Sequence, residues 1–318
     1  DIISAHDVPP HDNAAVDGYA VYFDDLNTDG ETRLPLIGRA TAGHPMTGPA
    51  AAGAAIRIFT GAAILPEADG TAPDTVFMQE DCKDDGSHVV VPSGIYRGAN
   101  KRARGEDVRA GDTILETGHR LRPQDVGLAA AIGQTHLEVY RRLKVAVFST
   151  GDEVFEPGAS LPPGGIYDAN RFTIAGLVES LGCEVNDLGI LADDRSTVTD
   201  ALREAAGHHD VLLTSGGVSV GEEDHVKAAV EDLGQLHFWR LAIRPGRPIA
   251  FGQINQVPFV GLPGNPVAVM VTFLRFARPM ILRRGGCRDV TPQHYRVRAA
   301  FDYRKKPGRR EWLRARLV

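Results

Sequence analysis

In the second half of the chain, short continuous apolar runs alternate with longer stretches that have helical spacing. Leu143 to Phe148 is the first such run, and its unbroken apolarity is typical of a strand buried on both faces of a parallel sheet. Strands are then predicted at 184–188, 210–214, 236–243, 248–254 and 257–261, and helices at 171–181, 196–206, 222–233 and 266–284. This alternation predicts a mostly parallel, doubly wound α/β domain.

The first half of the chain has a different pattern, in which short β-like runs are separated by clusters of Gly, Pro, Asp and Thr. Such runs occur at 55–59, 75–78 and 88–91, and they predict a small β-rich domain. A short buried helix is predicted at 121–136, and apolar residues alternate again at 295–301 in the manner of a strand. The chain is therefore expected to be a multidomain protein that combines α/β and β domains.

Four domains with the following boundaries are predicted. They are a linking domain of helix and strand at 1–21 and 111–140, a β-rich domain at 22–110, the α/β domain at 141–286, and the start of a truncated C-terminal β domain at 287–318. The chain begins without Met and stops inside a strand-like pattern, so we expect it to be part of a longer protein.

Three loops follow strands of the predicted α/β sheet, at 149–153, 215–217 and 262–266. In the last loop Asn265 is a good N-cap, and Pro266 occupies the first helical position, where proline is best tolerated. A helix that starts in this way offers free N–H groups and a positive dipole end to an anion. Ligands of doubly wound sheets bind at the carboxyl ends of the strands, so the loops predict one pocket for a phosphorylated ligand.

Carboxylates gather around these loops. They include Asp152, Glu153, Asp168, Asp193, Asp194 and Asp224. Ordinary helix capping is the alternative, and Asp168 and Glu222-Glu223 fit it well, whereas no helix clearly starts at Glu153. Carboxylates beside a phosphate site usually hold Mg²⁺, and Glu153 is therefore a candidate ligand. For Asp224 both interpretations, capping and function, stay open.

Three arginines surround a Pro-Gly turn at the end of a predicted strand. Arg240 and Arg244 are four residues apart, so along a strand they would point to the same face, and Arg247 follows the turn. Arginine binds phosphate and other oxyanions through paired hydrogen bonds, which favours an anion site. The alternative is a solvated edge strand whose charges suppress aggregation.

Charge is distributed unevenly along the 318 residues, which carry a net −6. Residues 278–318 hold 13 Lys and Arg against 3 Asp and Glu. This basic segment either grips an anion or contacts an acidic neighbouring domain. A pI of 6.0 and few aromatic residues near the basic cluster argue against nucleic-acid binding.

The three cysteines show no metal-ligand or disulfide spacing, which fits a reducing cytosol. No apolar run reaches membrane-spanning length and no signal peptide is visible, so neither a membrane nor an export route is expected. These features predict a cytoplasmic protein.

Nine stretches, taken together, resemble one known family. Several of them, such as Asp17-Gly18, Thr60-Gly61 and the segment 105–112, are only turn signals on their own. The stretches are DNAAVDGYAV, IRIFTGAAILPEAD, FMQED, GEDVRAGD, FSTGDEV, GGIYDANR, DVLLTSGGVSVGEEDHVK, FWRLAIRPGRP and GLPGNPVAV. In this order, and covering nearly the whole chain, they resemble the molybdopterin molybdenumtransferase family, which includes bacterial MoeA and the gephyrin E domain.

The resemblance implies an elongated homodimer with four domains per subunit and an active cleft between subunits. The α/β domain would be the MogA-like, molybdopterin-binding domain. The implied reaction joins adenylylated molybdopterin and molybdate, the two substrates, to give molybdenum cofactor and AMP, with Mg²⁺ as cofactor. The enzyme that supplies the adenylylated substrate, an adenylyltransferase, is an expected partner.

The resemblance also assigns residues. Catalytic positions are Asp17, Thr60, Asp107 and Glu153, of which Glu153, with Asp224, would hold the metal. Substrate-binding positions are Ser215, Gly216, Gly217, Asp224, Arg240, Arg244, Arg247, Pro263, Gly264, Asn265, Pro266 and Arg314. The chain departs from the family pattern at Ala14 (usually Ser), at Val16 (usually Met), and in having arginines where the family usually has lysines.

Two other functions are weighed against this one. The adenylylation step that precedes metal insertion uses the same type of α/β domain, but the long β-rich region with its matching motifs favours the insertion enzyme. A non-catalytic scaffold like gephyrin is the second alternative. The retained acidic residues Asp17, Asp107 and Glu153 argue against it.

Overall fold

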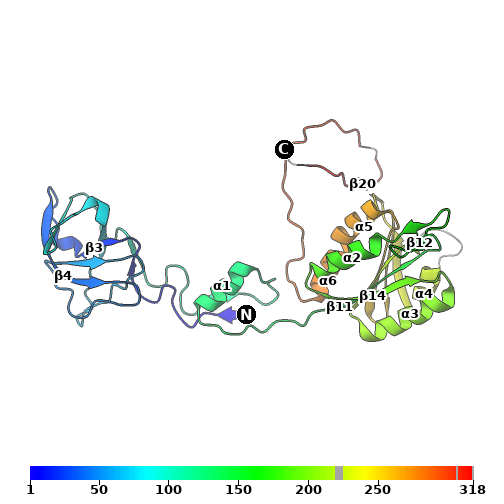
Figure 1. The fold of residues 1–318 in the computed structure, drawn as a ribbon, viewed down its shortest axis with the longest axis horizontal. Helices are drawn as coiled ribbons and strands as arrows, with labels where there is room; N and C mark the ends of the chain where they lie inside the picture. The colour runs from blue at the N-terminus through cyan, green and yellow to red at the C-terminus, as the bar shows by residue number, and fades with distance from the viewer. Residues whose placement is uncertain (219–224, 306, 317–318) are drawn as a thin grey trace. The chain divides into compact units, whose positions relative to one another are not determined.

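The computed structural model describes residues 1–218, 225–305 and 307–316. The chain forms two compact units, residues 1–137 and residues 138–318 (Figure 1). Each unit is described by itself. The finer division into four domains stays a prediction.

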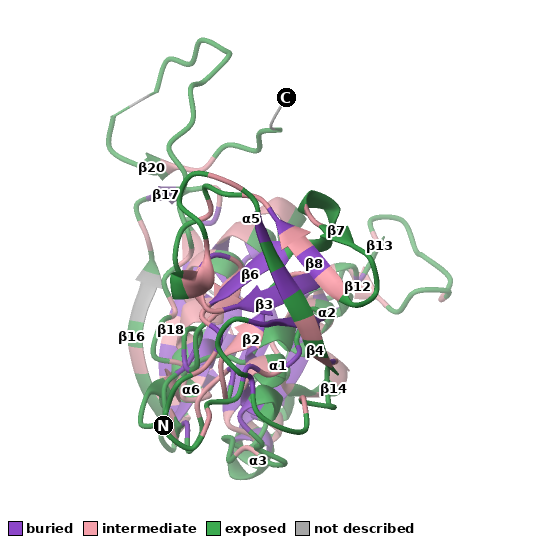
Figure 2. Ribbon diagram, turned by 90° about the vertical axis from the view of Figure 1, so that its left-hand side faces the viewer, coloured by how far each residue is buried: buried purple, intermediate pink, exposed green. Residues whose placement is uncertain are grey.

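A six-stranded sheet forms the core of the first unit. Its order is β6 (Thr75–Met78), β3 (Gly18–Val21), β5 (Ala55–Ile58), β4 (Thr32–Ala40), β8 (His88–Val91) and β7 (Lys83–Asp84). All neighbours are antiparallel except β4 and β5. Buried residues concentrate on β3, β6 and β8, whereas β7 is exposed (Figure 2), and the strands predicted at 55–59, 75–78 and 88–91 are confirmed.

Alternation along the strands gives this sheet two apolar faces. Ala20, Ile56 and Ile58 pack on one face, and Tyr19, Val21 and Phe77 pack on the other. The β-rich pattern of the first half of the sequence therefore corresponds to a sheet with a small core on each side.

Shorter elements complete the first unit. The strand β1 (Ile2–Ile3) pairs with β10 (Thr113–Leu115), and β2 (Asn13–Ala14) pairs with β9 (Lys101–Arg102). Two 3-10 turns occupy Phe23–Asp25 and Gln79–Asp81. The predicted helix is α1 (Pro123–Ala131), which starts with proline in its first turn, and the carboxylate of Asp125 accepts from the backbone N–H of Arg122 at 2.8 Å.

The second unit contains a mixed six-stranded sheet. Its order is β14 (Glu184–Leu191), β11 (Lys144–Thr150), β15 (Val211–Ser215), β19 (Val257–Leu262), β18 (Pro248–Ile254) and β16 (Gly234–Arg240). The first four strands are parallel, and β18 runs antiparallel to both of its neighbours, β19 and β16. The prediction of a mostly parallel sheet is therefore confirmed, with an antiparallel pair at one edge.

Helices cover both faces of this sheet, as a doubly wound fold requires (Figure 1). One core packs against α2 (Asn170–Glu179), α5 (Pro266–Thr272) and α6 (Arg278–Arg284). The other core packs against α3 (Arg195–His208) and α4 (His225–Leu233). The predicted helix 266–284 is continuous, with a π-helical turn at Phe273–Ala277 between α5 and α6.

Two predictions are wrong in the second unit. The strand predicted at 236–243 ends at Arg240, and a separate two-residue strand, β17 (Ile243–Arg244), follows. No strand forms at 295–301, because that segment has no pairing partner among the described residues. The C-terminal segment instead contributes β20 (Arg310–Glu311), which pairs in parallel with β17. The remaining short pair joins β12 (Val154–Phe155) to β13 (Ile166–Tyr167).

Candidate active site

The carboxyl ends of three neighbouring strands form one rim in the second unit. Ser149 of β11 lies opposite Ser215 of β15, and Ser215 lies opposite Leu262 of β19. The three loops that follow these strands are therefore adjacent, as the sequence predicts. The N–H of Gly216 donates to the carbonyl of Leu262 at 3.2 Å and ties two of the loops together.

Two glycines draw the loop after β15 against the end of β11. Gly216 has φ of +85°, and a Cβ there would lie 2.5 Å from the carbonyl oxygen of Thr150. Gly217 has φ of +62°, and its Cβ would lie 2.7 Å from the Thr150 hydroxyl. Only glycine combines this backbone conformation with such a close approach.

Buried hydroxyl groups without partners lie at this rim. The side-chain oxygens of Ser149, Thr150 and Thr214 have no hydrogen-bond partner among the described residues. These three residues are at most 2 % exposed. An unsatisfied buried polar group costs about 1–3 kcal/mol, so a polar ligand atom at the rim would recover free energy that folding leaves unused.

The loop before α5 is built as predicted. Oδ1 of Asn265 accepts hydrogen bonds from the N–H groups of Val267 (3.0 Å) and Ala268 (3.2 Å), and Pro266 is the first helical residue. Pro263 is buried, whereas Gly264, Asn265 and Pro266 are exposed. The expectation of free N–H groups at this helix start is therefore wrong for Val267 and Ala268, because the Asn265 cap accepts both. The exposed part of the loop presents the positive end of the helix dipole to a ligand, and the buried Pro263 anchors the loop.

Asn170, at the start of α2, is a rim residue that the sequence analysis missed. Its Nδ2 donates to the carbonyl of Gly264 at 2.7 Å, and its buried Oδ1 has no partner among the described residues. The only signal in the sequence was its place in the stretch GGIYDANR, because an asparagine before an apolar helix otherwise indicates a cap.

Glu153 lies in a turn that leads into β12, and no helix starts there, as predicted. Its carboxylate is exposed and folds over Gly151, where an added Cβ would lie 2.7 Å from Oε2. The predicted companion Asp224 lies outside the described residues, so a Glu153–Asp224 metal pair stays a prediction. Within the described ranges no three His, Cys, Asp or Glu side chains converge as a metal site.

The oxygen donors near Glu153 nevertheless suit Mg²⁺, which prefers hard oxygen ligands and retains several waters. An exposed carboxylate supplies one ligand. The orphaned hydroxyls of Ser149 and Thr150 come from the strand that ends just before it, but successive strand residues point to opposite faces of the sheet, so only one of them can join the same ion. The donor set therefore fits a cation that is shared with substrate phosphates rather than enclosed by protein.

Two other carboxylates of this region have structural partners. Asp168 is 4 % exposed and accepts hydrogen bonds from the backbone and guanidinium of Arg171. Burial alone would lower the pKa of Arg171, but its bonds to Asp187 and Asp168 hold it above the usual value. Asp194 caps α3 by accepting from the Thr197 N–H at 2.9 Å. The capping interpretation of both residues is confirmed.

The three arginines lie on a turn that packs against α5. Leu241 N–H donates to the carbonyl of Arg247 at 3.0 Å, and a Cβ on Gly246 would lie 2.4 Å from the Thr272 side chain. Arg240, Arg244 and Arg247 are exposed. Because the strand stops at Arg240, the argument that Arg240 and Arg244 share one face of a strand fails. The turn instead places Arg240 beside Arg247, since Arg240 pairs with Pro248, whereas Arg244 pairs with the C-terminal segment.

Arg314 lies on the C-terminal segment and is exposed. That segment is attached to the arginine turn through the pairing of β20 with β17. The basic C-terminal segment therefore lies beside the turn that carries Arg244.

The first unit holds the other three predicted catalytic residues. The N–H and hydroxyl of Thr60 both donate to Oδ1 of Asp17 at 2.8 Å. These two hydrogen bonds lower the pKa of Asp17 below its usual value, with a smaller contribution from the charge of Arg57. Asp17 is therefore held as a carboxylate with one oxygen engaged.

Asp107 belongs to the same face of the first unit. Its Oδ2 lies 2.6 Å from the Arg102 guanidinium, and Arg102 is part of β9, which pairs with β2. Ala14 of β2 accepts from the N–H of Gly61, so the strand pair connects the Asp107 loop to the Thr60 turn. The departure at Ala14 is accommodated in the core, where this residue is 1 % exposed.

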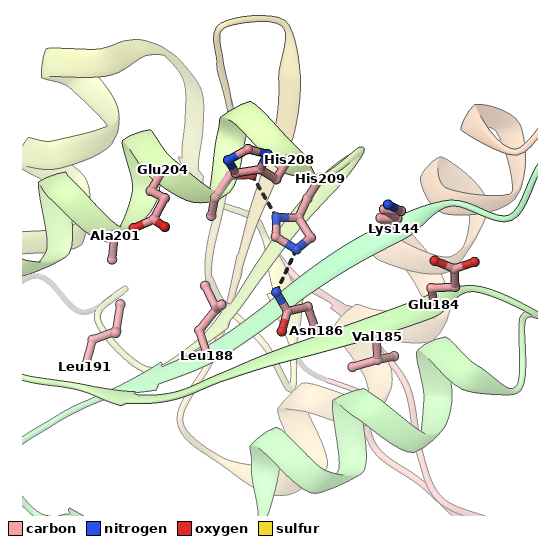
Figure 3. Close-up of a pocket in the computed structure, with 11 residues that line it drawn as sticks. Lys144, Glu184, Val185, Asn186, Leu188, Leu191, Ala201, Glu204, His208 and His209 are labelled. Atoms are coloured by element: carbon pink, nitrogen blue, oxygen red, sulfur yellow. Dashed lines mark hydrogen bonds between the residues drawn. The ribbon is translucent and has the colours of Figure 1, made fainter.

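A pocket of about 570 Å³ lies away from the predicted residues, along the edge strand β14 and α3 (Figure 3). His209 lines it, with Nδ1 at 2.8 Å from the carbonyl of Ala205 and Nε2 at 3.0 Å from the Asn186 amide. Both ring nitrogens are therefore occupied. We assign the chemistry to the rim, because the pocket contains none of the converging groups described above.

Comparisons with known proteins identify the family of the chain. Residues 1–133 match the family model "MoeA N-terminal region (domain I and II)", and residues 146–283 match "Probable molybdopterin binding domain". The chain is 43% identical over 316 residues to a molybdopterin molybdenumtransferase of Haemophilus influenzae, covering 99% of the chain and 76% of that protein. A protein of the same name from Nostoc sp. is 34% identical, covering 97% of the chain and 71% of the relative.

Solved structures give the same result. A molybdopterin biosynthesis MoeA protein of Pyrococcus horikoshii superposes with a TM-score of 0.75 at 30% identity, covering 91% of this chain and 71% of the other. A second structure of this kind, also from Pyrococcus, has a TM-score of 0.68 at 34% identity, with 90% and 71% covered.

Proposed function

The chain belongs to the molybdopterin molybdenumtransferase family, and on that premise we propose that it is the transferase that inserts molybdenum during cofactor biosynthesis. Its substrates are adenylylated molybdopterin and molybdate, and its products are molybdenum cofactor and AMP. The observation that carries the proposal is the rim, where three loops, a capped helix start and unpartnered hydroxyls converge.

The rim suits a substrate with a pyrophosphate link. The start of α5 offers the positive end of its helix dipole to phosphate oxygens, although its N–H groups at Val267 and Ala268 are already bonded to Asn265. Ser149 and Thr150 offer hydroxyl groups that have no other partner among the described residues. Together these groups would orient the phosphates before the anhydride bond is broken and AMP leaves.

Glu153, with Asp224, is proposed to hold Mg²⁺. When bound, the ion would supply Lewis-acid polarisation of the phosphoryl oxygens. Glu153 itself keeps an exposed carboxylate directed over Gly151, so it reaches the rim without displacing any internal hydrogen bond that the structure describes.

The arginine turn is proposed to receive the molybdate oxyanion, with Arg240, Arg244, Arg247 and Arg314 as its cations. Arginine retains its charge at any physiological pH and pairs with two oxygens at once, so the replacement of the usual lysines preserves an oxyanion site. Tungstate, which has the same charge and shape, is the natural comparison in every assay.

Asp17, Thr60 and Asp107 are proposed to complete the cleft from the partner subunit of a homodimer. Thr60 fixes one oxygen of Asp17, and Arg102 fixes Asp107, so each carboxylate has a defined orientation. We also propose that the protein works in the cytoplasm and receives its substrate from an adenylyltransferase. No helix in the described ranges is long and apolar enough to cross a membrane.

The adenylylation and scaffold alternatives are less well supported. The relatives named above are molybdenumtransferases, and the match to the MoeA N-terminal region covers the part of the chain that a simple adenylyltransferase lacks. A requirement for ATP instead of molybdate would revive the first alternative.

The test is AMP release from adenylylated molybdopterin with Mg²⁺, in the presence and absence of molybdate. We expect molybdate-dependent release, and a product that activates an apo-molybdoenzyme. Glu153→Ala and Asp17→Ala should each slow release by roughly a hundredfold, the range seen when one transition-state contact is removed. Asp200→Asn, an exposed carboxylate on α3, is the matched control. Near-normal rates in both site variants would refute the proposed roles.

A further inference from the structure

The C-terminal segment is fastened to the proposed oxyanion site by backbone hydrogen bonds. Arg310 N–H donates to the carbonyl of Ala242, and Trp312 N–H donates to the carbonyl of Arg244, both at 2.9 Å. The Arg275 guanidinium lies 5.6 Å from the centre of the Trp312 ring and adds a cation–π contact. These contacts place Glu311 beside the arginine turn.

Glu311 carries a buried carboxylate next to an exposed cation. Its side chain is 6% exposed, whereas that of Arg244 is 64% exposed. Oε1 of Glu311 lies 3.6 Å from Nη1 of Arg244, and Oε2 accepts a hydrogen bond from the hydroxyl of Tyr303. That hydrogen bond raises the pKa of Tyr303, as expected when a phenol donates to a nearby anion. The carboxyl group of Glu311 is therefore held between Tyr303 and Arg244.

The other arginines of the turn have no such partner. In the ranges that the structure describes, Arg240 and Arg247 make no ion pair. Three cations on one turn would hold any tetrahedral dianion strongly, including the sulfate and phosphate that are abundant in cells. A fixed carboxylate beside Arg244 lowers the net charge that such an anion meets.

We propose that Glu311 acts through Arg244 as a positioning residue that sets the charge selectivity of the oxyanion site. Its negative charge weakens the binding of dianions more than that of monoanions, because the repulsion grows with the charge of the ligand. The site then releases molybdate more readily after binding it, because the repulsion weakens the binding of molybdate as it does that of every dianion. This inference rests on the proposed function, since it assumes that the arginine turn receives the oxyanion.

A purely structural role for Glu311 makes a different prediction. If the carboxylate only fastens the C-terminal segment, its removal changes the affinity for all anions by the same factor or not at all. Neither core cluster of the second unit contains a residue beyond Leu282, so neutralising Glu311 leaves the sheet folded. Charge dependence therefore separates the two roles.

The experiment measures oxyanion binding to the 318-residue chain by calorimetry at constant ionic strength and neutral pH. Sulfate, molybdate and tungstate are the dianions, and perchlorate is the monoanion of similar shape. We expect Glu311→Gln to tighten dianion binding about tenfold and perchlorate binding only about threefold, as screened Coulomb repulsion requires. Glu311→Asp, which keeps the charge, should retain the selectivity of the wild type.

Arg244→Gln locates the binding and separates the two hypotheses. If this variant loses dianion binding and Glu311→Gln shows the charge-dependent gain, the inference holds. If Arg244→Gln loses binding but Glu311→Gln changes both classes of anion equally or not at all, the inference is overturned and the proposed oxyanion site stands. If neither the wild type nor Glu311→Gln binds these dianions, the oxyanion site and the inference both fall.

Discussion

Replacing the unpartnered hydroxyl of Thr150 measures how much stability the protein loses by keeping this polar group at the rim. Thr150 is 2 % exposed, and its Oγ1 makes no hydrogen bond with any described residue. Valine has the same shape without the hydroxyl and suits a strand. Thr150→Val should therefore raise the free energy of unfolding of the ligand-free protein by about 1 kcal/mol, since a buried polar group without a partner costs about 1–3 kcal/mol.

The same substitution should weaken function. If the hydroxyl contacts a phosphate of the bound substrate, its loss should reduce substrate affinity by about five- to tenfold, the value of one hydrogen bond. Urea unfolding gives the stability, and titration with adenylylated molybdopterin gives the affinity. The result that supports the reasoning is a gain in stability together with a loss of substrate affinity.

A partnered threonine of the same unit provides the control. Thr272 is fully buried, and its hydroxyl donates to the carbonyl of Ala268 at 2.7 Å. Thr272→Val should lower stability by about 0.5–1.5 kcal/mol, because it removes a hydrogen bond that is made. If Thr150→Val destabilises as much as Thr272→Val and leaves affinity unchanged, the Thr150 hydroxyl has a structural partner and the reasoning is refuted.

Three further predictions follow from the same structure. Arg171→Met should lower the free energy of unfolding, measured by urea titration, by about 3–5 kcal/mol, because it leaves buried Asp168 without its counter-ion. Arg203→Met, at an exposed ion pair, is the control and should change the same quantity by less than about 1 kcal/mol. The hydrogen bonds from Thr60 lower the pKa of Asp17, so they stabilise the folded protein at pH values above the unfolded pKa of about 4, and this stabilisation is lost as the pH falls through the folded pKa. Thr60→Val should raise the folded pKa of Asp17 in a carboxyl NMR titration, and an unchanged titration would contradict the assignment. Gly216→Ala should abolish substrate binding while the protein stays folded by circular dichroism, because the new Cβ meets a backbone carbonyl; retained affinity would show that the rim tolerates a shifted loop.

The sequence predicts the rim well because the features that create it are local. Continuous apolar strands, the Asn265 cap and the glycine pair can all be recognised without knowing the tertiary structure, and parallel strands necessarily end on one side. The role of Asn170 could not be predicted, because it depends on a contact between distant segments and not on a local pattern. Its local pattern indicates a helix start, and only the packing of α2 beside the loop at Gly264 gives its amide another use.

The errors fall where pairing partners decide the structure. The alternation at 295–301 suits a strand, but no described segment pairs with it. The strand before the arginine turn stops at Arg240, because Leu241 hydrogen-bonds to Arg247 across the turn and leaves the ladder. Both outcomes depend on contacts between distant segments, which an alternating pattern does not specify.

The departures from local rules in the second unit concentrate at the rim. Glycines with positive φ draw two loops together, and hydroxyls of neighbouring strands are buried without a partner among the described residues. Elsewhere in the same unit Asp168 is paired with Arg171 and Asp194 with the start of α3, although the Thr199 hydroxyl on α3 is also buried without a described partner. The rim differs because several such hydroxyls lie together on adjacent strand ends, where a polar ligand would satisfy them and where apolar residues would otherwise raise stability. The same reasoning explains Glu311. A buried carboxylate beside a cationic turn lowers the strength of anion binding, which is useful only where the anion is a substrate that must also be released.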